Sequence, residues 1–350
     1  MERIARPTIS DVARRAGVST ATVSRVLAGI GRSRPDTAAA VTSAAEALGY
    51  RPSGVARSLR MQRTRTLGLI VSDIQNPFFP ELVRAADDAA RAIDYSILLG
   101  SAAFDETRAV HYLNLMVDRR VDGMIVASSQ ISDSTWGWLI DSPVPVIVVN
   151  AEPPDSRVAA IASDNEGGSQ LAVRHLVGLG HTRIAYISGP QSFTAARPRL
   201  EGFRKACRDA GLDPNATPEF ASDGQVEGAE LVAGQLIDRM PWITAIACYN
   251  DLTAIGALRA LRAAGRRAPG DVSVIGFDDI AAASWVVPRL TTVSQQKAEM
   301  GRLAVDYLAR ALEARHGAVA PEVIRLTTLL RERESTGPAP VVPQSAAGDG

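Results

Sequence analysis

The chain has 350 residues, 46% of them hydrophobic and 22% charged, and its 38 basic side chains balance 38 acidic ones. This length is sufficient for two or three domains with buried cores. No run of about 18 apolar residues appears, which argues against a membrane-spanning helix, and the first residues lack the apolar core of a secretion signal. The two cysteines cannot form a disulfide scaffold and have no neighbours spaced for zinc. We therefore expect a soluble, cytoplasmic protein without a metal or a cofactor.

Positive charge is concentrated at the start of the chain. Residues 1–65 contain twelve arginines and four acidic residues, a net charge of +8, so the remaining 285 residues carry −8. The alternative is a solvated surface that is merely rich in arginine, since the whole chain has only two lysines, Lys205 and Lys297. A general preference for arginine over lysine does not explain why the net charge is positive in residues 1–65 and negative in the rest of the chain. A basic segment on an acidic body favours a polyanion as the partner of the first segment.

Three short helices are predicted in the first 50 residues. Thr8 followed by Asp11 is a capping-box pattern, and Gly17 suits a tight turn. Pro35 is a favourable first-turn residue, and Gly49 is a typical helix stop. The expected helices cover residues 9–16, 20–28 and 35–48. Two short helices joined by a tight turn and braced by a third indicate a helix-turn-helix head.

The exposed face of the second predicted helix is small, polar and basic, as a reader of the DNA major groove requires. Arg25 can bond a guanine through two donors, and Ala21 can touch a thymine methyl. A three-helix unit that binds protein or only dimerises is the alternative, and the basic face favours DNA. The predicted base contacts are Thr20, Ala21, Ser24 and Arg25. Phosphate contacts, which set affinity without reading sequence, are predicted at Arg6, Arg32, Arg34 and Arg51.

The head also resembles a known family. Residues 8–19 read TISDVARRAGVS and residues 22–27 read TVSRVL, which is similar to the signature of the lactose/galactose-repressor (LacI/GalR) transcription factors. The segments LGYRP at 48–52 and ARSL at 56–59 resemble the hinge of that family. The resemblance extends over about residues 7–334.

The resemblance implies a hinge helix over residues 53–60 that folds only on operator DNA, because eight residues are too few for a stable isolated helix. Two copies would enter the minor groove together, with Leu59 as the apolar wedge beside Ala56 and Arg60. A plain linker is the alternative. Gly54 departs from the family pattern and should cost about 0.5–1 kcal/mol of hinge helicity. Ala28 replaces the usual asparagine after the recognition helix, which puts contacts near that end in doubt.

From Thr66 onward, short apolar segments alternate with helical ones, which predicts parallel sheets buried on both faces. We expect a doubly wound α/β body, and the resemblance implies the two-lobed architecture of periplasmic binding proteins. The expected strands are 67–71, 96–99, 123–127, 146–149, 159–162, 184–187, 245–248 and 272–276. The expected helices are 79–92, 106–119, 167–179, 199–210, 226–239 and 252–264. The expected organisation is a head at 1–50, a hinge and linker at 51–65, a body at 66–334 with a first lobe of 66–162 plus 291–321 and a second lobe of 163–290 plus 322–334, and a disordered tail at 335–350.

Ligands of such folds bind beyond the carboxyl ends of the strands, so polar residues that follow strands are the candidate effector contacts. The sequence RLEGF at 199–203 resembles the effector-arginine motif of the family, and the planar fork of Arg199 suits vicinal hydroxyls or a carboxylate. Asp251 is expected to cap the helix it precedes. The predicted effector residues are Phe79, Ser129, Asn150, Arg199, Asn250, Asp278 and Trp285.

Sugar-sensing relatives often place an aromatic residue near the position of Asp223 and Gly224, and this chain has none there. Either Trp285 supplies that ring from another loop, or the ligand is less hydrophobic than a pyranose. A sugar or sugar derivative is the favoured effector, and a nucleobase, an amino-acid derivative or another small polar metabolite is the alternative. The dimer surface is expected to use residues 79–92 and 280–287.

The resulting prediction is a homodimeric repressor that binds a near-palindromic operator in double-stranded DNA under effector control. An enzyme is not expected, because no nucleophile and base recur as a pair. The adjacent carboxylates of Asp278 and Asp279 would point opposite ways if extended. A solute-binding protein of a transport system is the rival, and the basic segment at 1–65 contradicts the export that it needs.

Overall fold

The computed structural model describes residues 7–27, 33–50, 63–128, 130–314 and 319–340. The chain divides into two compact units, residues 1–65 and 66–350. Among the described residues, no helix is both long and apolar enough to cross a membrane.

The head consists of helices α1 (Ile9–Ala16), α2 (Thr20–Leu27) and α3 (Pro35–Leu48). The capping box is present, since the Thr8 side chain accepts from the Asp11 amide and the Asp11 carboxylate accepts from the Thr8 amide. Gly17 ends α1 with a φ of 67°, a conformation that glycine adopts without strain. Val12, Val23 and Val41, one from each helix, are fully buried against one another. The three helices predicted from the sequence are therefore confirmed.

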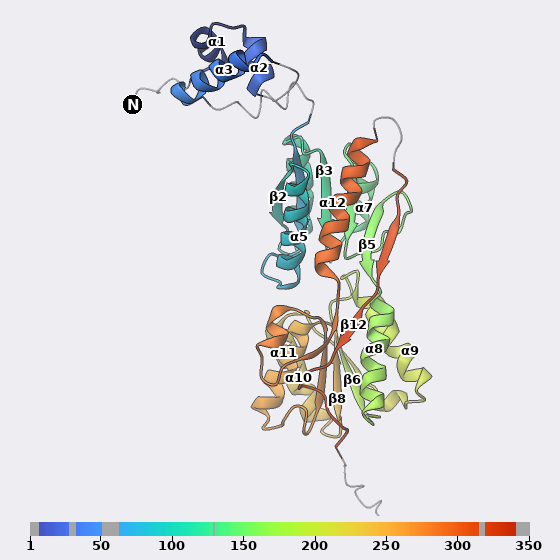
Figure 1. Ribbon diagram of the computed structural model, residues 1–350. Coiled ribbons are helices and arrows are strands. Elements are labelled where there is room, and N and C mark those ends of the chain that lie inside the picture. Colours follow the sequence, from blue (N-terminus) through green and yellow to red (C-terminus); the bar gives the residue numbers. More distant parts are fainter. Residues whose placement is uncertain (1–6, 28–32, 51–62, 129, 315–318, 341–350) are drawn as a thin grey trace, which may run out of the picture. The chain divides into compact units, whose positions relative to one another are not determined.

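The first lobe is a six-stranded sheet in the order β11-β5-β4-β3-β1-β2, with all neighbours parallel. Helices α5 and α12 pack together on one face, and α6 and α7 cover the other (Figure 1). The strands are β1 (Thr66–Val71), β2 (Ser96–Ser101), β3 (Gly123–Ala127), β4 (Val146–Val149), β5 (Ala159–Ser163) and β11 (Val323–Leu326). The helices are α5 (Phe78–Ala92), α6 (Glu106–Asp118), α7 (Asp133–Ile140) and α12 (Lys297–Glu313).

The second lobe repeats this plan with a sheet in the order β12-β10-β9-β8-β6-β7, in which only the β10–β12 pair is antiparallel. Helices α10 and α11 pack on one face, and α8 and α9 on the other. The strands are β6 (Ile184–Ser188), β7 (Glu219–Ala221), β8 (Ala245–Cys248), β9 (Ser273–Asp278), β10 (Thr291–Ser294) and β12 (Leu329–Arg331). The helices are α8 (Asn165–Gly178), α9 (Ala196–Asp209), α10 (Val226–Arg239) and α11 (Asp251–Ala263), with 3-10 turns η1 (Pro214–Ala216) and η2 (Ala281–Ser284).

Two predicted lobe boundaries are wrong. Residues 291–294 were expected in the first lobe, but β10 pairs with β9 of the second sheet. Residues 323–326 were expected in the second lobe, but β11 pairs with β5 of the first sheet. The chain therefore passes between the lobes after β5, after β10 and after β11. The correction follows from strand pairing over long sequence separations, which local patterns do not encode.

The predicted disordered tail is also wrong for its first six residues. Ser335 is fully buried, and its hydroxyl donates to the carbonyl of Val274 on β9. The Gly337 carbonyl lies 3.0 Å from Nε2 of His181, and the amide of Ala339 donates to the carbonyl of Leu179. Residues 335–340 thus form a strap on the second lobe, and residues 341–350 lie outside the described part.

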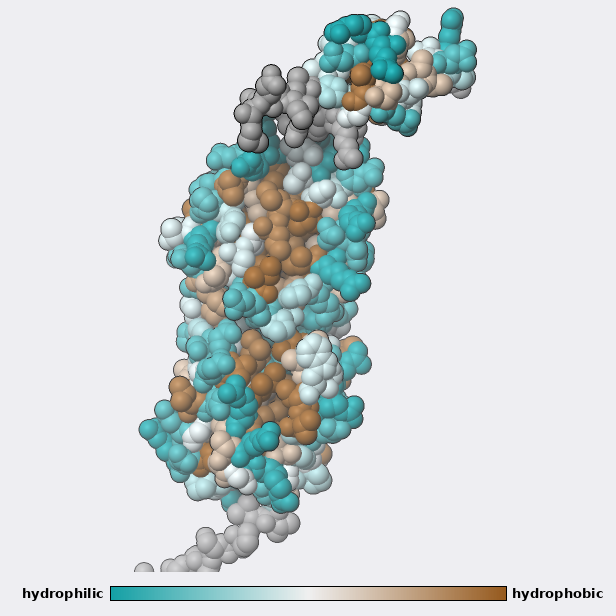
Figure 2. Space-filling view, turned by 90° about the vertical axis from the view of Figure 1, so that its left-hand side faces the viewer, coloured by the Kyte–Doolittle hydropathy of each residue, from teal (hydrophilic) through white to brown (hydrophobic). Residues whose placement is uncertain are grey.

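One face of the body exposes apolar side chains on both lobes. Figure 2 shows two apolar patches, one on each lobe, on the side that carries β2, α5 and α11 in Figure 1. Strand β2 is an edge strand and exposes Leu98 and Leu99. Just after η2, Trp285 and Val287 are among the most exposed large apolar residues of the described chain. Contiguous exposed apolar patches are typical of a face that another protein covers.

Candidate DNA-reading face and effector site

Helix α2 presents the residues that the sequence predicts as base contacts. Thr20, Ala21 and Arg25 are exposed, and Ser24 is half-buried. Val23 of the same helix is fully buried in the head core, so the helix is held with its polar face outward. The Ser19 hydroxyl accepts from the Thr22 amide and caps the start of the helix. An exposed polar and basic face on a helix anchored in this way has the chemistry to enter a major groove.

Among the predicted phosphate contacts, Arg34 is exposed and stands at the cap position before α3. The remaining predicted head and hinge residues lie outside the described residues, namely Arg6, Arg32, Arg51, Ala56, Leu59 and Arg60. Ser129, predicted as an effector contact, also lies outside them.

A polar cavity of about 360 Å³ opens between the two lobes. The first lobe contributes residues that follow β4, together with Arg325 of β11, and the second lobe contributes the starts of α8 and α9. Its lining is Asn150, Ala151, Glu152, Ser163, Asp164, Asn165, Glu166, Thr194, Pro198, Glu201 and Arg325. The Glu152 carboxylate accepts from both Nε and Nη2 of Arg325, and this contact holds the pKa of the Glu152 carboxyl below its usual range. The volume is suited to a small metabolite.

Two side chains at this cavity have polar atoms without a partner among the described residues. Oδ1 of Asn150 and Oγ of Ser163 are buried and make no hydrogen bond. Asn150 has a φ of 65°, which is uncommon for a residue other than glycine. Unsatisfied buried polar groups are costly, and they are few in folded proteins. An acceptor and a hydroxyl left open at a cavity between lobes indicate a place where a polar ligand binds.

Arg199, the predicted effector arginine, is only 3% exposed and is not among the residues that line this cavity. Its Nε donates to Oδ1 of Asn165 over 2.8 Å, and its Nη1 donates to the carbonyl of Tyr249 over 2.6 Å. The guanidinium also lies over the rings of Phe277 and Tyr249, at 3.7 Å and 4.8 Å from their centroids. Because Asn165 contacts both Arg199 and the cavity, the arginine is linked to the ligand space through one amide.

Asp278 completes the surroundings of Arg199. Its Oδ1 lies 3.2 Å from Nη2 of Arg199 and accepts from the Gln295 amide over 2.6 Å. Burial raises the pKa of the Asp278 carboxyl, and the Arg199 charge offsets part of that rise. Burial raises the pKa of the Asp251 carboxyl as well. The structure thus brings the predicted Arg199 and Asp278 together as a buried ion pair.

Other predicted effector residues have different roles. Phe79, predicted to contact the effector, is 1% exposed, belongs to the core between α5 and α12 and does not line the cavity between the lobes. Asn250 caps α11, since its Oδ1 accepts from the Thr253 amide, and its Nδ2 donates to the Gly224 carbonyl. The prediction that Asp251 caps this helix is wrong, because Asp251 is buried and accepts from the Ile280 amide. Trp285 is 75% exposed and lines neither of the cavities described for the body.

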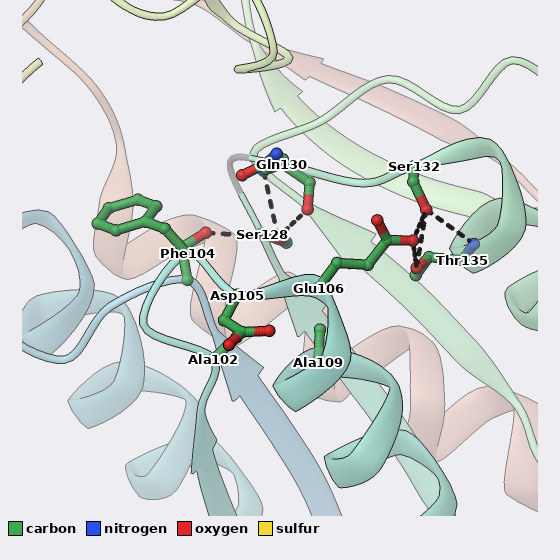
Figure 3. A pocket seen from close by; sticks show the side chains of 10 residues that line it. Ala102, Phe104, Asp105, Glu106, Ala109, Ser128, Gln130, Ser132 and Thr135 are labelled. Atoms are coloured by element: carbon green, nitrogen blue, oxygen red, sulfur yellow. Dashed lines mark hydrogen bonds between the residues drawn. The ribbon is translucent and has the colours of Figure 1, made fainter. Parts of the chain in front are cut away.

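A smaller pocket lies within the first lobe, at the carboxyl ends of β1, β2 and β3 (Figure 3). The Ser128 hydroxyl donates to the Gln130 carbonyl, and Glu106 accepts from the hydroxyls of Ser132 and Ser134. These bonds satisfy the hydroxyls within the pocket. Its free space, about 20 Å³, corresponds to about one water molecule.

Sequence reasoning missed Ser163 and Asn165 as site residues. They stand at the end of β5 and the start of α8, where the chain first passes between the lobes. A polar residue at the end of a buried strand indicates such a site. The prediction of Asn150 rests on this pattern, and Ser163 shows the same pattern at the end of β5.

Comparison with known proteins identifies the chain. Residues 8–53 match the model of the bacterial regulatory proteins of the lacI family, and residues 173–336 match a periplasmic binding protein-like domain. The ribose operon repressor of Escherichia coli K12 is 36% identical over 94% of this chain and 99% of its own length. The transcriptional repressor PurR of Aliivibrio fischeri is 34% identical over 92% of this chain and 98% of its own.

The chain belongs to the lacI family of bacterial regulatory proteins. A solved structure of the lac repressor dimer bound to operator and an anti-inducer aligns with a TM-score of 0.86 at 28% identity, covering 95% of this chain and all of that one. The predicted family, the helix-turn-helix head and the two-lobed body of this transcriptional regulator are therefore confirmed.

Proposed function

We propose that this lacI-family regulator is a homodimeric repressor whose affinity for a near-palindromic operator is set by a small polar metabolite bound between its lobes. The observation that carries the proposal is that one chain joins an anchored helix with an exposed reading face to a body whose interlobe cavity holds unsatisfied polar atoms. The relatives that match almost their full length are named as repressors. The proposed regulator acts in the cytoplasm and performs no catalytic step.

Operator reading is assigned to Thr20, Ala21, Ser24 and Arg25, with the hinge residues Ala56, Leu59 and Arg60 in the minor groove and Arg6, Arg32, Arg34 and Arg51 on phosphates. Selection of duplexes from a random library, followed by fluorescence anisotropy at increasing salt, tests this assignment. The expected result is a palindromic consensus and a linear loss of log affinity with log salt. Failure to bind any duplex at low salt would favour the solute-binding rival.

The proposed effector is a neutral polyol, a sugar or sugar derivative. A hydroxyl of such a ligand would donate to Oδ1 of Asn150 and exchange a hydrogen bond with Oγ of Ser163. The cavity rim has four carboxylates, those of Glu152, Asp164, Glu166 and Glu201, and one cation, Arg325, so an anionic ligand meets repulsion. Thermal-shift screening with D-ribose and D-ribose 5-phosphate tests the charge preference, because a ligand that binds the native state raises the melting temperature. A larger shift with the phosphate would contradict the polyol assignment and favour an anionic metabolite.

The dimer is assigned to α5 and the exposed Leu98 and Leu99 of β2 in the first lobe, and to the exposed Trp285 and Val287 beyond η2 in the second. A closed dimer with two-fold symmetry uses the same surface on both subunits. Analytical ultracentrifugation of Trp285→Glu tests this surface, with Leu231→Glu on the outer face of α10 as a control. The expected outcome is dissociation of the first variant alone, and a dimer that survives Trp285→Glu would place the interface elsewhere.

A further inference from the structure

Two phenylalanine rings stack across the gap between the lobes. Phe104 lies in the loop between β2 and α6 of the first lobe, and Phe193 lies in the loop between β6 and α9 of the second. Their centroids are 5.3 Å apart, and their planes differ by 14°. Both rings are half-buried, unlike the fully enclosed Phe79, so a ligand that enters the gap can reach them.

Phe193 lies beside the position where the sequence lacks an aromatic residue. A Cβ built on Gly224 would lie 3.7 Å from Phe193 and 3.7 Å from Tyr249. The ring of Phe193 therefore lies against the backbone at Gly224, although it comes from a different loop. Phe193 also lies 6.3 Å from the ring of Tyr249, whose carbonyl accepts from Arg199. Tyr249 thus lies between the ring of Phe193 and the buried arginine.

The loop that carries Phe104 has an unfavourable backbone. Ala103 and Phe104 have φ values of 51° and 57°, in the left-handed region that residues with a Cβ rarely adopt. Consecutive residues in this region store strain, which persists only where the surrounding structure holds it. Figure 3 shows the Phe104 ring pointing away from the pocket of the first lobe. Backbone hydrogen bonds within the first lobe hold this conformation, since the amide of Phe104 donates to the carbonyl of Ser72 and the amide of Asp105 donates to that of Ala102. In this conformation the ring stacks on Phe193.

We propose that Phe193 is the stacking surface for the ring of the effector and that Phe104 occupies the place of that ring while the site is empty. The effector replaces the Phe104 ring on the face of Phe193. The ligand class is a polar molecule with one flat ring face, since ring stacking accepts a furanose, a pyranose or a base, and the open atoms of Asn150 and Ser163 require hydroxyl or amino groups. This inference rests on the proposed function, because it assumes an effector between the lobes.

The proposal predicts that Phe104→Ala and Phe193→Ala change effector binding in opposite directions. Saturation-transfer NMR and calorimetry use D-ribose, cellobiose, adenine and phenol as probes on the full-length protein. Removing the competing ring in Phe104→Ala should strengthen binding of the recognised probe at least fivefold, and Phe193→Ala should weaken it at least fivefold. Leu231→Ala, on the exposed face of α10 at 71% exposure, is the matched control and should bind as the wild type does.

Phenol makes the test independent of the natural effector. Deleting the Phe104 ring leaves a slot of one ring's shape on Phe193, so phenol should bind Phe104→Ala and should fail to bind the Phe104→Ala, Phe193→Ala double variant. Equal phenol binding by the single and double variants would overturn the proposal, as would weaker probe binding in both single variants. Binding of D-ribose and cellobiose, compared with binding of adenine, shows which kind of ring the site accepts.

A ligand-free measurement checks the contact itself. The melting temperatures of the wild type, the two single variants and the double variant form a cycle, and neighbours in contact should deviate from additivity. Additive shifts would overturn the stack. Operator binding, followed in parallel by anisotropy, should persist in every variant. Its absence in the wild type would refute the proposed function, whereas a failed ring exchange with intact operator binding refutes only the present inference.

Discussion

Replacing Arg199 by alanine should lower the stability of the second lobe, and this loss is expected even without an effector. The change removes the partner of Asp278, empties the space between the rings of Phe277 and Tyr249, and leaves the Tyr249 carbonyl without its donor. Breaking a buried ion pair from one side costs about 3–5 kcal/mol. With an unfolding entropy of about 2 cal/mol/K per residue, about 4 kcal/mol lowers the melting temperature by roughly 7 °C if the whole body unfolds together, and by roughly 13 °C if the second lobe unfolds alone.

Differential scanning calorimetry of the full-length protein measures this loss. Arg204→Ala is the matched control, because Arg204 lies on the same helix α9 and pairs with Glu219 at the surface. An exposed pair contributes about 0–1 kcal/mol, so the control should melt within about 2 °C of the wild type if the whole body unfolds together, and within about 3 °C if the second lobe unfolds alone. Adding Asp278→Asn to Arg199→Ala should recover part of the loss, since it removes the unpaired charge. Equal melting of Arg199→Ala and the control would refute the view that a buried ion pair organises this site.

Further outcomes are expected in the head and at His181. Arg25→Ala should cost about 1–3 kcal/mol on the selected operator and flatten base preference, whereas Arg34→Ala should weaken all duplexes about equally and reduce the salt slope by about one, both by anisotropy. Thr8→Ala removes the capping contacts with Asp11 and should cost the head about 1 kcal/mol, seen as faster hydrogen exchange in α1. Burial lowers the pKa of His181, so its stabilising effect is complete above the unfolded pKa of about 6.5 and is lost as the pH falls toward the folded pKa. The melting temperature should therefore decrease from pH 7 to pH 5, and His181→Gln should make that decrease shallower.

Local signals in the sequence predicted the head accurately because its structure is determined by near neighbours. The Thr8 and Asp11 pair, the left-handed Gly17 and the buried Val23 all act within one or two helical turns. The apolar strands of the body were found for a similar reason, since continuous apolar segments are the pattern of a sheet buried on both faces. Helices α7 and α12 and strands β7, β10, β11 and β12 were missed.

The features that the sequence did not predict depend on contacts between residues that are far apart in the chain. Strand β10 belongs to the second lobe because it pairs with β9, and β11 belongs to the first lobe because it pairs with β5. A short stretch of sequence does not reveal such pairings. Phe79 fails as a ligand contact because the rotation of α5 about its axis directs that ring into the core. The stack of Phe104 on Phe193 joins residues 89 positions apart in two lobes, so no spacing rule suggests it. The chemistry of Arg199 and Asp278 was predictable, while their mutual pairing was not.

One buried ammonium joins the surroundings of Arg199 in the second lobe to helix α5 of the first lobe. Lys297, the first residue of α12, donates from Nζ to the carbonyls of Asp278 and Asp279 over 2.7 Å and 2.9 Å, and lies 3.3 Å from a carboxylate oxygen of Glu81 on α5. The side chain of Asp278 meanwhile pairs with Arg199. A ligand that displaces the backbone at Asp278 would alter the contacts of Lys297, whose charge needs its partners at 3% exposure. Because α12 packs along α5, such a displacement acts on a helix of the proposed dimer face, and by linkage a partner that fixes α5 must change effector affinity in turn.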